Sequence, residues 1–184
     1  MEKAERKYLV HLIDTNPLGD PKTAVYDTTN YVRLGQDLEE YTENLNPDVT
    51  TTKNIWGENT VTHNGYTVSS DVDPYYVYLD KSSPEALGEK LAYIANNRCT
   101  GKPCHTTKVD ILLDSSENVI WAYREDVVVV PNSIGGDTSG IKIPFSINNN
   151  GNRVKGDFDL ETKIFTPEGS ESTPEVQQMN YSEY

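Results

Sequence analysis

Basic residues are scarce in this chain. Lysine and arginine together number 16 against 29 aspartates and glutamates, so the formal net charge of the 184 residues is −13 at pH 7. A protein that binds nucleic acid needs lysine or arginine to displace counterions from the phosphates. The charge therefore argues against a conventional nucleic-acid binder. It remains compatible with a wall past which DNA slides without adhering, and equally with solubility alone.

Long hydrophobic segments are also missing. Hydrophobic residues make up 35% of the chain, and the mean hydropathy is −0.64. No stretch is apolar over the length that a membrane span requires, and the charged N-terminus precedes no apolar segment typical of a signal peptide. We therefore expect a protein without membrane association that stays in the cytoplasm where it is made.

The length is that of a single domain. Because the hydrophobic content is low, we expect a thin β-sandwich with polar loops over residues 1–167. Residues 168–184 are acidic, polar and without lysine or arginine, and this composition predicts a flexible tail. Tyrosine, with 12 copies against 3 phenylalanines and 2 tryptophans, suits half-exposed sheet faces and subunit contacts.

Residues that could bind a metal are few. Cys99, Cys104 and His105 lie in one loop, but their spacing differs from the paired-cysteine pattern of zinc sites and no fourth ligand pair follows. A disulfide between the two cysteines is disfavoured in a reducing cytoplasm. We interpret them as ordinary cysteines at the end of a helix, and we expect no metal and no cofactor.

No catalytic pattern is evident. Residues 136–140 (GDTSG) superficially resemble the nucleophile motif of trypsin-like proteases, but Thr138 separates the aspartate from the serine. We interpret this segment as a tight loop. His11 and His63 are isolated, and an isolated histidine is more often a surface or hydrogen-bonded core residue than a catalyst. No glycine-rich phosphate loop opens a helix, and no carboxylate pair stands out, so we expect no enzymatic activity.

Hydrophobic periodicity predicts mainly strands. They are expected over residues 8–13, 65–68, 75–79, 109–113 and 119–130. Residues 38–49 are acidic and interrupted by Pro47, which favours an extended segment over a helix. Between residues 25 and 34 the expected buried positions are Tyr26, Tyr31, Val32 and Leu34.

A single helix is expected over residues 83–97. Ser82 or Ser83 would cap it, with Pro84 in its first turn. Leu87, Leu91 and Ile94, with Ala95 beside them, recur at helical spacing.

Residues 127–165 carry the clearest pattern in the chain. A run of four valines ends at Pro131, and a turn-rich loop with three glycines follows. Apolar residues then alternate with polar ones over 141–147 and again over 154–160, separated by an asparagine-rich and glycine-containing turn. This pattern predicts a β-hairpin with one buried face, entered from a long hydrophobic strand.

The order of these elements resembles the C-terminal core of the major tail tube proteins of tailed bacteriophages of the siphophage type. The matching pieces are residues 127–131, 135–137, 143–145, Gly151 and 154–156. The resemblance covers most of residues 8–167. It implies a mainly β fold of two antiparallel sheets in a sandwich or barrel, with one flanking α-helix and a long loop or hairpin that reaches neighbouring subunits. It implies no catalysis.

The same resemblance implies partners and a location. Hexameric rings would stack into the hollow tail tube of a virion, built in the cytoplasm of a bacterial host. The tube would meet a tape measure protein and tail initiator and terminator proteins. Double-stranded DNA would pass through it without specific binding, along a lumen expected to be negative.

The polar segment over residues 50–65 is the expected inter-subunit element. It is rich in threonine, which favours strands, and it carries two large apolar residues among polar neighbours. The candidate interface residues are Thr52, Asn54, Ile55 and Trp56. We expect the segment to become ordered in the assembled tube, with Trp56 as its main contact.

Two alternatives stay open. Within the same architecture, the chain would be the inner tube subunit of a contractile bacteriocin or injection machine. In a different class, it would be a secreted β-sandwich that binds carbohydrate through exposed tryptophan and tyrosine rings. The missing signal peptide and the C-terminal resemblance both oppose the second alternative. A hydrolase is a third and weaker hypothesis.

Overall fold

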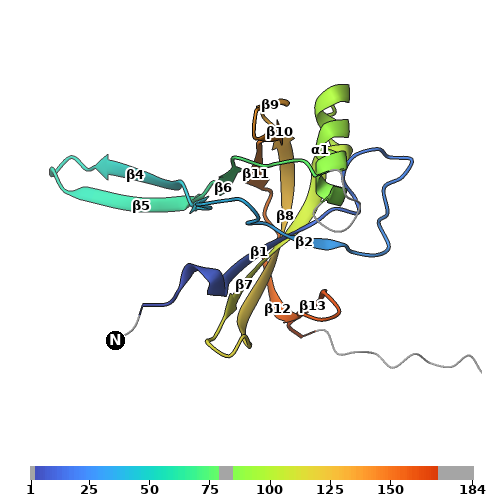
Figure 1. The fold of residues 1–184 in the computed structure, drawn as a ribbon. Helices are drawn as coiled ribbons and strands as arrows, with labels where there is room; N and C mark the ends of the chain where they lie inside the picture. Colours follow the sequence, from blue (N-terminus) through green and yellow to red (C-terminus); the bar gives the residue numbers. More distant parts are fainter. Residues whose placement is uncertain (1–2, 79–84, 170–184) are drawn as a thin grey trace, which may run out of the picture.

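The computed structural model describes residues 3–78 and 85–169, whose fold is drawn in Figure 1. In chain order the strands are β1 (Leu9–Asp14), β2 (Tyr31–Arg33), β3 (Glu43–Asn44), β4 (Pro47–Lys53), β5 (Asn59–Tyr66), β6 (Ser69–Val72), β7 (His105–Leu113), β8 (Val119–Pro131), β9 (Gly135–Asp137), β10 (Gly140–Lys142), β11 (Phe145–Asn149), β12 (Val154–Asp159) and β13 (Ile164–Pro167). The helix α1 spans Glu85–Asn97, and two 3₁₀ turns cover Arg6–Tyr8 and Lys102–Cys104. The expected mainly β fold with antiparallel sheets and one flanking α-helix is confirmed for the described residues.

Strand β8 organises the sheet. Its 13 residues include the valine run, whose β-branched side chains favour extended backbone. One edge of β8 pairs with β7 along most of its length. The other edge is shared, because β12 pairs with residues 122–124 and β11 with residues 127–131. Nine strands thereby join one sheet, while β4–β5 and β9–β10 each form a separate two-stranded sheet.

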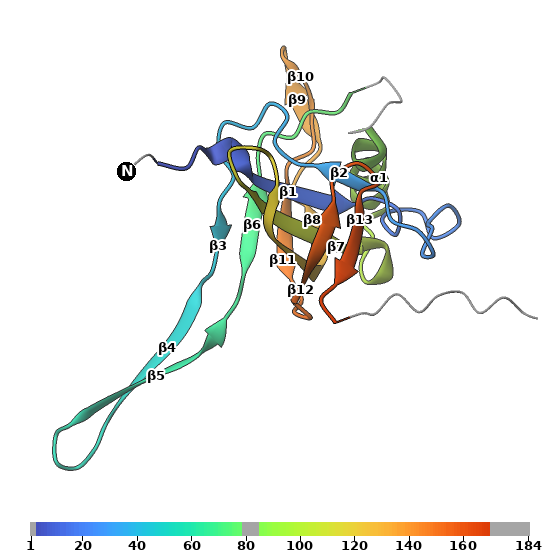
Figure 2. The same cartoon turned by 90° about the horizontal axis from the view of Figure 1, so that it is seen from below.

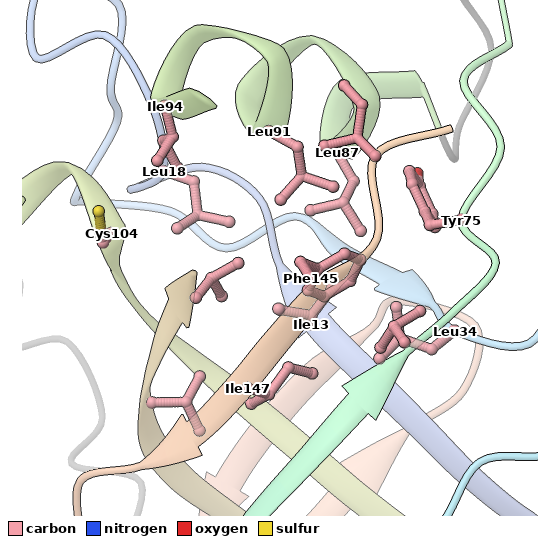
Figure 3. Packing of buried hydrophobic residues seen from close by; sticks show 14 residues of the cluster. Ile13, Leu18, Leu34, Tyr75, Leu87, Leu91, Ile94, Cys104, Phe145 and Ile147 are labelled. Carbon is pink, nitrogen blue, oxygen red and sulfur yellow. The ribbon is translucent and has the colours of Figure 1, made fainter. Parts of the chain in front are cut away.

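The helix covers one face of this sheet. Leu87, Leu91 and Ile94 recur at positions i, i+4 and i+7 and are buried against Ile13 and Phe145 (Figure 3). Burying each such side chain contributes about 1.5 to 3 kcal/mol relative to leaving it exposed. The helical periodicity is thus confirmed, whereas the predicted capping residues 82–84 lie outside the described residues.

The β12–β13 hairpin, which joins the sheet at β8, packs against the opposite face of strands β1 and β7. Val10 and Leu12 of β1 belong to this second cluster, while Ile13 belongs to the cluster under α1, as alternation along a strand requires. The ring of Tyr31 meets the ring of Phe158 edge-on, with centroids 5.7 Å apart. Both faces of the sheet are therefore protected from water, one by a helix and the other by a hairpin.

The predicted hairpin between residues 141–147 and 154–160 is wrong. Strand β11 pairs with β6 and β8, and β12 pairs with β13 and β8, so the two lie one after the other along the same edge of β8. The alternation is also broken at Pro144, before which β10 pairs with β9. Alternation identified the buried side chains of Ile143, Phe145 and Ile147 correctly, but Ile141 and Leu160, expected on the same apolar face, are exposed. Alternation also does not specify the partner strand.

Other predictions had mixed outcomes. The strands expected over 8–13, 109–113 and 119–130 are present as β1, β7 and β8, and residues 38–49 form no helix. Residues 65–68 and 75–78 are not strands of their own: Gly65 and Tyr66 end β5, β6 follows at Ser69, and Tyr76 makes only an isolated bridge to Lys142, while residue 79 lies outside the described residues. Tyr31, Val32 and Leu34 are buried as expected, but Tyr26 is half exposed and lies beneath the ammonium group of Lys102.

Candidate functional site: a projecting hairpin

Strands β4 and β5 form a hairpin that leaves the body of the molecule (Figure 1 and Figure 2). Its pairing runs from Pro47 opposite Tyr66 to Lys53 opposite Asn59, with a bulge at Asp48 and Val49. Nearly every residue of both strands is exposed. At about 3.4 Å per residue, the seven residues of β4 extend roughly 24 Å. The hairpin therefore reaches well beyond the body of the molecule.

The tip of the hairpin is ordered by Asn54. Its Oδ1 atom accepts the backbone N–H groups of Trp56 and Glu58 at 3.0 and 2.9 Å, and its amide donates to Glu58 Oε2 at 2.8 Å. Gly57 has φ 84°, a left-handed conformation that suits glycine. Since these bonds satisfy the turn internally, the side chains of Ile55 and Trp56 point into solvent.

The predicted interface residues are brought together at this tip. Ile55 is 96% exposed and Trp56 is 80% exposed. Thr52 lies opposite Thr60, one pair before the last pair of the hairpin. Asn54 makes the hydrogen bonds that order the turn. A polar hairpin of two strands is marginally stable in water by itself, and two large apolar side chains at its end favour contact with a second surface.

A buried cluster of charged side chains lies at the root of the hairpin. Lys108 and Asp110 of β7 alternate with the buried residues Val109 and Ile111, and so point to the face that carries α1. Lys108 Nζ binds Glu43 Oε1 on β3 and lies 3.2 Å from Asp110 Oδ2. Glu43 begins the segment that leads into β4, so this pair ties the hairpin to the body.

Two aromatic residues complete the cluster on one side. His11 Nδ1 donates to Asp110 Oδ1 at 2.7 Å, and the His11 ring packs against Tyr41, with centroids 4.5 Å apart. The Tyr41 hydroxyl lies 2.8 Å from Ser70 Oγ on β6. His11 is therefore a buried, hydrogen-bonded core residue, as the sequence suggested.

Glu125 and Arg153 extend the cluster on the other side. Arg153 donates to Glu125 Oε2 at 2.9 Å and lies 3.6 Å from Asp110 Oδ2. The Asn149 amide donates to Glu43 Oε1 at 3.0 Å. Strands β3, β7, β8 and β11 are thus linked through charged side chains beneath the hairpin root.

Lys108 and Asp110 keep their charges at neutral pH. Burial alone would raise the pKa of Asp110, but the hydrogen bond from His11 and the charge of Lys108 hold it below its ordinary value. Burial alone would lower the pKa of Lys108, but Asp110, Tyr41 and Glu43 raise it above its ordinary value. Both groups are therefore charged in the folded protein.

Sequence reasoning missed this cluster. The alternation of Val109, Ile111 and Leu113 predicted a strand, and no role was assigned to Lys108 or Asp110. Lys108 and Asp110 occur in a strand that is paired on both edges, where charges need partners, but this pairing is not evident from the sequence. Their partners, His11 and Glu43, are distant in sequence, so no local pattern connects them.

The other sequence motifs occupy ordinary positions. In the loop of residues 136–140, Asp137 accepts the backbone N–H of Ser139 and pairs with Lys142 at 2.8 Å, all at the surface. Cys99 and Cys104 are free thiols, and Cys104 Sγ donates to the carbonyl oxygen of Cys99. Within residues 3–78 and 85–169, no three His, Cys, Asp or Glu side chains group closely enough to hold a metal ion. No helix in this part of the chain has the length and hydrophobicity needed to cross a membrane.

Comparison with known proteins gives limited guidance. No family model matches the chain, and no curated protein matches it. Among solved structures, it is similar to a chain of the cryo-EM structure of the anti-feeding prophage (AFP) baseplate, 6-fold symmetrised. That similarity has a TM-score of 0.41 and 10% sequence identity, and covers 84% of this chain and 95% of that chain. At this level the likeness assigns no role to any residue.

Proposed function

We propose that this chain is a structural subunit that assembles with copies of itself into a phage-tail-like tube. The observation that carries the proposal is the β4–β5 hairpin, which extends from the body with Ile55 and Trp56 exposed at its tip. The resemblance of the sequence to tail tube proteins supports the same reading. The hairpin is the element that contacts a neighbouring copy.

The energetics favour a role in assembly over a role within one subunit. Association costs at least about 4 kcal/mol in lost translational and rotational freedom, while burying a large apolar side chain returns roughly 2 to 3 kcal/mol. A single tip contact therefore gives a weak pair of subunits. Contacts repeated around a ring and between rings add up to a stable polymer, so a hairpin of this kind is useful only in a repetitive assembly.

In this proposal six subunits form a ring, and rings stack into a hollow tube within a virion. Double-stranded DNA passes along an acidic lumen without specific binding, and the tube meets a tape measure protein and tail initiator and terminator proteins. The subunit has no catalytic role. The inner tube of a contractile injection machine remains the nearest alternative, because it uses the same architecture.

A carbohydrate-binding module is less well supported. Such a module stacks sugars on neighbouring aromatic rings, but Trp56 lies in the turn of the hairpin, whereas Tyr66 pairs with Pro47 at its base. The Tyr66 ring packs instead against His63, with centroids 4.5 Å apart. The exposed rings of Trp56 and Tyr66 therefore do not form one platform.

The proposal predicts that Trp56→Asp leaves a folded monomer that no longer polymerises. Negative-stain microscopy and analytical ultracentrifugation of the concentrated protein should show rings or tubes for the parent and monomers for the variant. Ile120→Asp, at another exposed apolar side chain on the body, is the matched control and should still assemble. If the parent remains monomeric at high concentration even with tail initiator components, or if Trp56→Asp assembles as readily, the proposal fails.

A further inference from the structure

An apolar groove lies beside the C-terminal end of α1. It has a volume of about 570 Å³, and its lining comes from the end of α1, the loop that follows, the end of β8 and residues 132–134. Ile94 and Cys104 at its base are buried, while Val130 and Ile134 are 43% and 49% exposed. The groove thus presents apolar side chains to solvent at a place where the described chain does not cover them.

Among the described residues that line this groove, Arg98 alone is charged. It has φ 51°, and it follows α1 in a position that glycine usually occupies. The Cys99 N–H bonds the Ile94 carbonyl and the Arg98 N–H bonds the Ala95 carbonyl, which fixes the backbone there. Within residues 3–78 and 85–169, the Arg98 guanidinium forms no ion pair. A positive charge is therefore held at the rim of an apolar groove.

The hairpin tip has the complementary composition. Residues 54–58 contain the two exposed apolar side chains, Ile55 and Trp56, and a single charge, Glu58. Glu58 Oε2 accepts the Asn54 amide, and no ion pair involves Glu58 among the described residues. The tip therefore combines apolar bulk with the negative charge of Glu58, with Lys53 flanking the turn beside Gly57, and the groove combines apolar walls with one positive charge.

The tip and the groove lie on opposite sides of the molecule. In both Figure 1 and Figure 2 the hairpin projects to one side of the body, and α1 lies on the other. The tip of one subunit cannot reach the groove of the same subunit. When the tip of one subunit enters the groove of a second, the groove of the first and the tip of the second stay open. Such head-to-tail contacts propagate into rings when the rotation closes, or into helical polymers when it does not.

We propose that the groove beside α1 receives the hairpin tip of a second copy of this chain. Trp56 and Ile55 enter the groove, and Glu58 pairs with Arg98 at its rim. This inference rests on the proposed function and adds to it the surface that the hairpin recognises. It predicts a head-to-tail contact in which every subunit inserts its tip into one neighbour and receives the tip of another.

Cross-linking tests the contact directly, because Cys99 already lines the groove. Ile55→Cys should link to Cys99 of the next subunit under mild oxidation or with a short bismaleimide, and give a ladder of multimers on a non-reducing gel. The ladder should disappear in Ile55→Cys/Cys99→Ser/Cys104→Ser. Glu161→Cys, in an exposed turn elsewhere, should give no ladder. Dimers alone would indicate tip-to-tip contact and overturn the proposal, as would a ladder that persists without Cys99 and Cys104.

Charge reversal tests the pairing of Glu58 with Arg98. Glu58→Arg and Arg98→Glu should each raise the critical concentration for assembly by about fivefold, and the double variant should recover most of the loss. Glu161→Arg, which changes the net charge as Glu58→Arg does, is the matched control and should not raise the critical concentration. If the critical concentration of the double variant is raised by the product of the two single-variant factors, the two effects are independent and the pairing is refuted.

These experiments separate the two proposals. Tubes that form without a ladder and without rescue would overturn the groove contact and leave the tube function standing. A ladder and rescue in a protein that forms only short oligomers would support the contact and count against the tube.

Discussion

Lys108 is 1% exposed, yet it carries a full charge on β7, which is paired with β1 and β8 on its two edges. Moving such a charge out of water costs several kcal/mol unless opposite charges and hydrogen bonds replace the lost solvent. Asp110 and Glu43 supply these partners. Because Glu43 belongs to the segment that enters the hairpin, the same pair that neutralises Lys108 also determines where the hairpin leaves the body.

We predict that Lys108→Met destabilises the protein by about 3 to 5 kcal/mol, because it leaves Asp110 buried without its main counterion. The measurement is urea unfolding at pH 7, with the change read from the midpoint at constant slope. Lys142→Met removes a surface ion pair with Asp137 and should have a far smaller effect. Equal losses in the two variants would show that the buried position of Lys108 is not what matters.

The pH dependence of stability should report Asp110. Because its pKa is lowered in the folded state, its contribution is present above the unfolded value of about 3.9 and is lost as the pH falls through the folded value. The stability gap between the parent and Asp110→Asn should therefore be wide at pH 7 and should narrow below about pH 4. The check is the urea midpoint of both proteins across this range. A gap that stays constant down to pH 2.5 would contradict the assignment.

At the scale of elements, β12 and β13 depend on close backbone approach at Gly156. A Cβ atom there would overlap the carbonyl oxygen of Thr166 and lie 2.6 Å from Cζ of Phe165. We predict that Gly156→Ala destabilises the fold by about 1 to 3 kcal/mol through overpacking. Gly135→Ala meets no atom within 4 Å and should be nearly neutral. Urea unfolding of both variants tests the contrast, and equal stability of the two would refute it.

Much of the element content could be predicted from the sequence, because it depends on local pattern. The helical spacing of Leu87, Leu91 and Ile94 and the valine run of β8 predicted α1 and the central strand. Strand pairing could not be predicted in the same way. Alternation over 154–160 is satisfied equally by β11, β13 or β8 as neighbour, and the pairing depends on the path of residues 150–153 and on distant contacts.

The same distinction between local pattern and tertiary contact applies to the candidate site. The tip residues Ile55 and Trp56 were visible in the sequence as large apolar side chains among polar ones, and the structure places them at the end of the hairpin. The charged cluster and the groove were not visible. Lys108 and Glu43 are 65 residues apart, and Arg98 and Ile134 line one groove because β8 returns beside the end of α1. Tertiary proximity, unlike periodicity, leaves no local signature.

At the scale of the whole molecule, two features would act against each other in the proposed assembly. The proposed contact between hairpin tip and groove would provide a weak directional attraction that gains strength by repetition. The net charge of −13 makes every subunit repel its neighbours, and an acidic wall around the lumen would increase that repulsion. The balance between the two is set by how far the charges act through the solvent.

We therefore predict that salt promotes assembly. The screening length falls from about 30 Å at 0.01 M to about 8 Å at 0.15 M ionic strength, which is shorter than the reach of the hairpin. Screening also weakens the pairing of Glu58 with Arg98, but an exposed pair contributes at most about 1 kcal/mol, whereas the repulsion involves the whole surface of both subunits. The critical concentration, measured by sedimentation, should fall as sodium chloride rises over this range. If it rises instead, attraction between complementary charged surfaces governs assembly, and the acidic surplus does not oppose it.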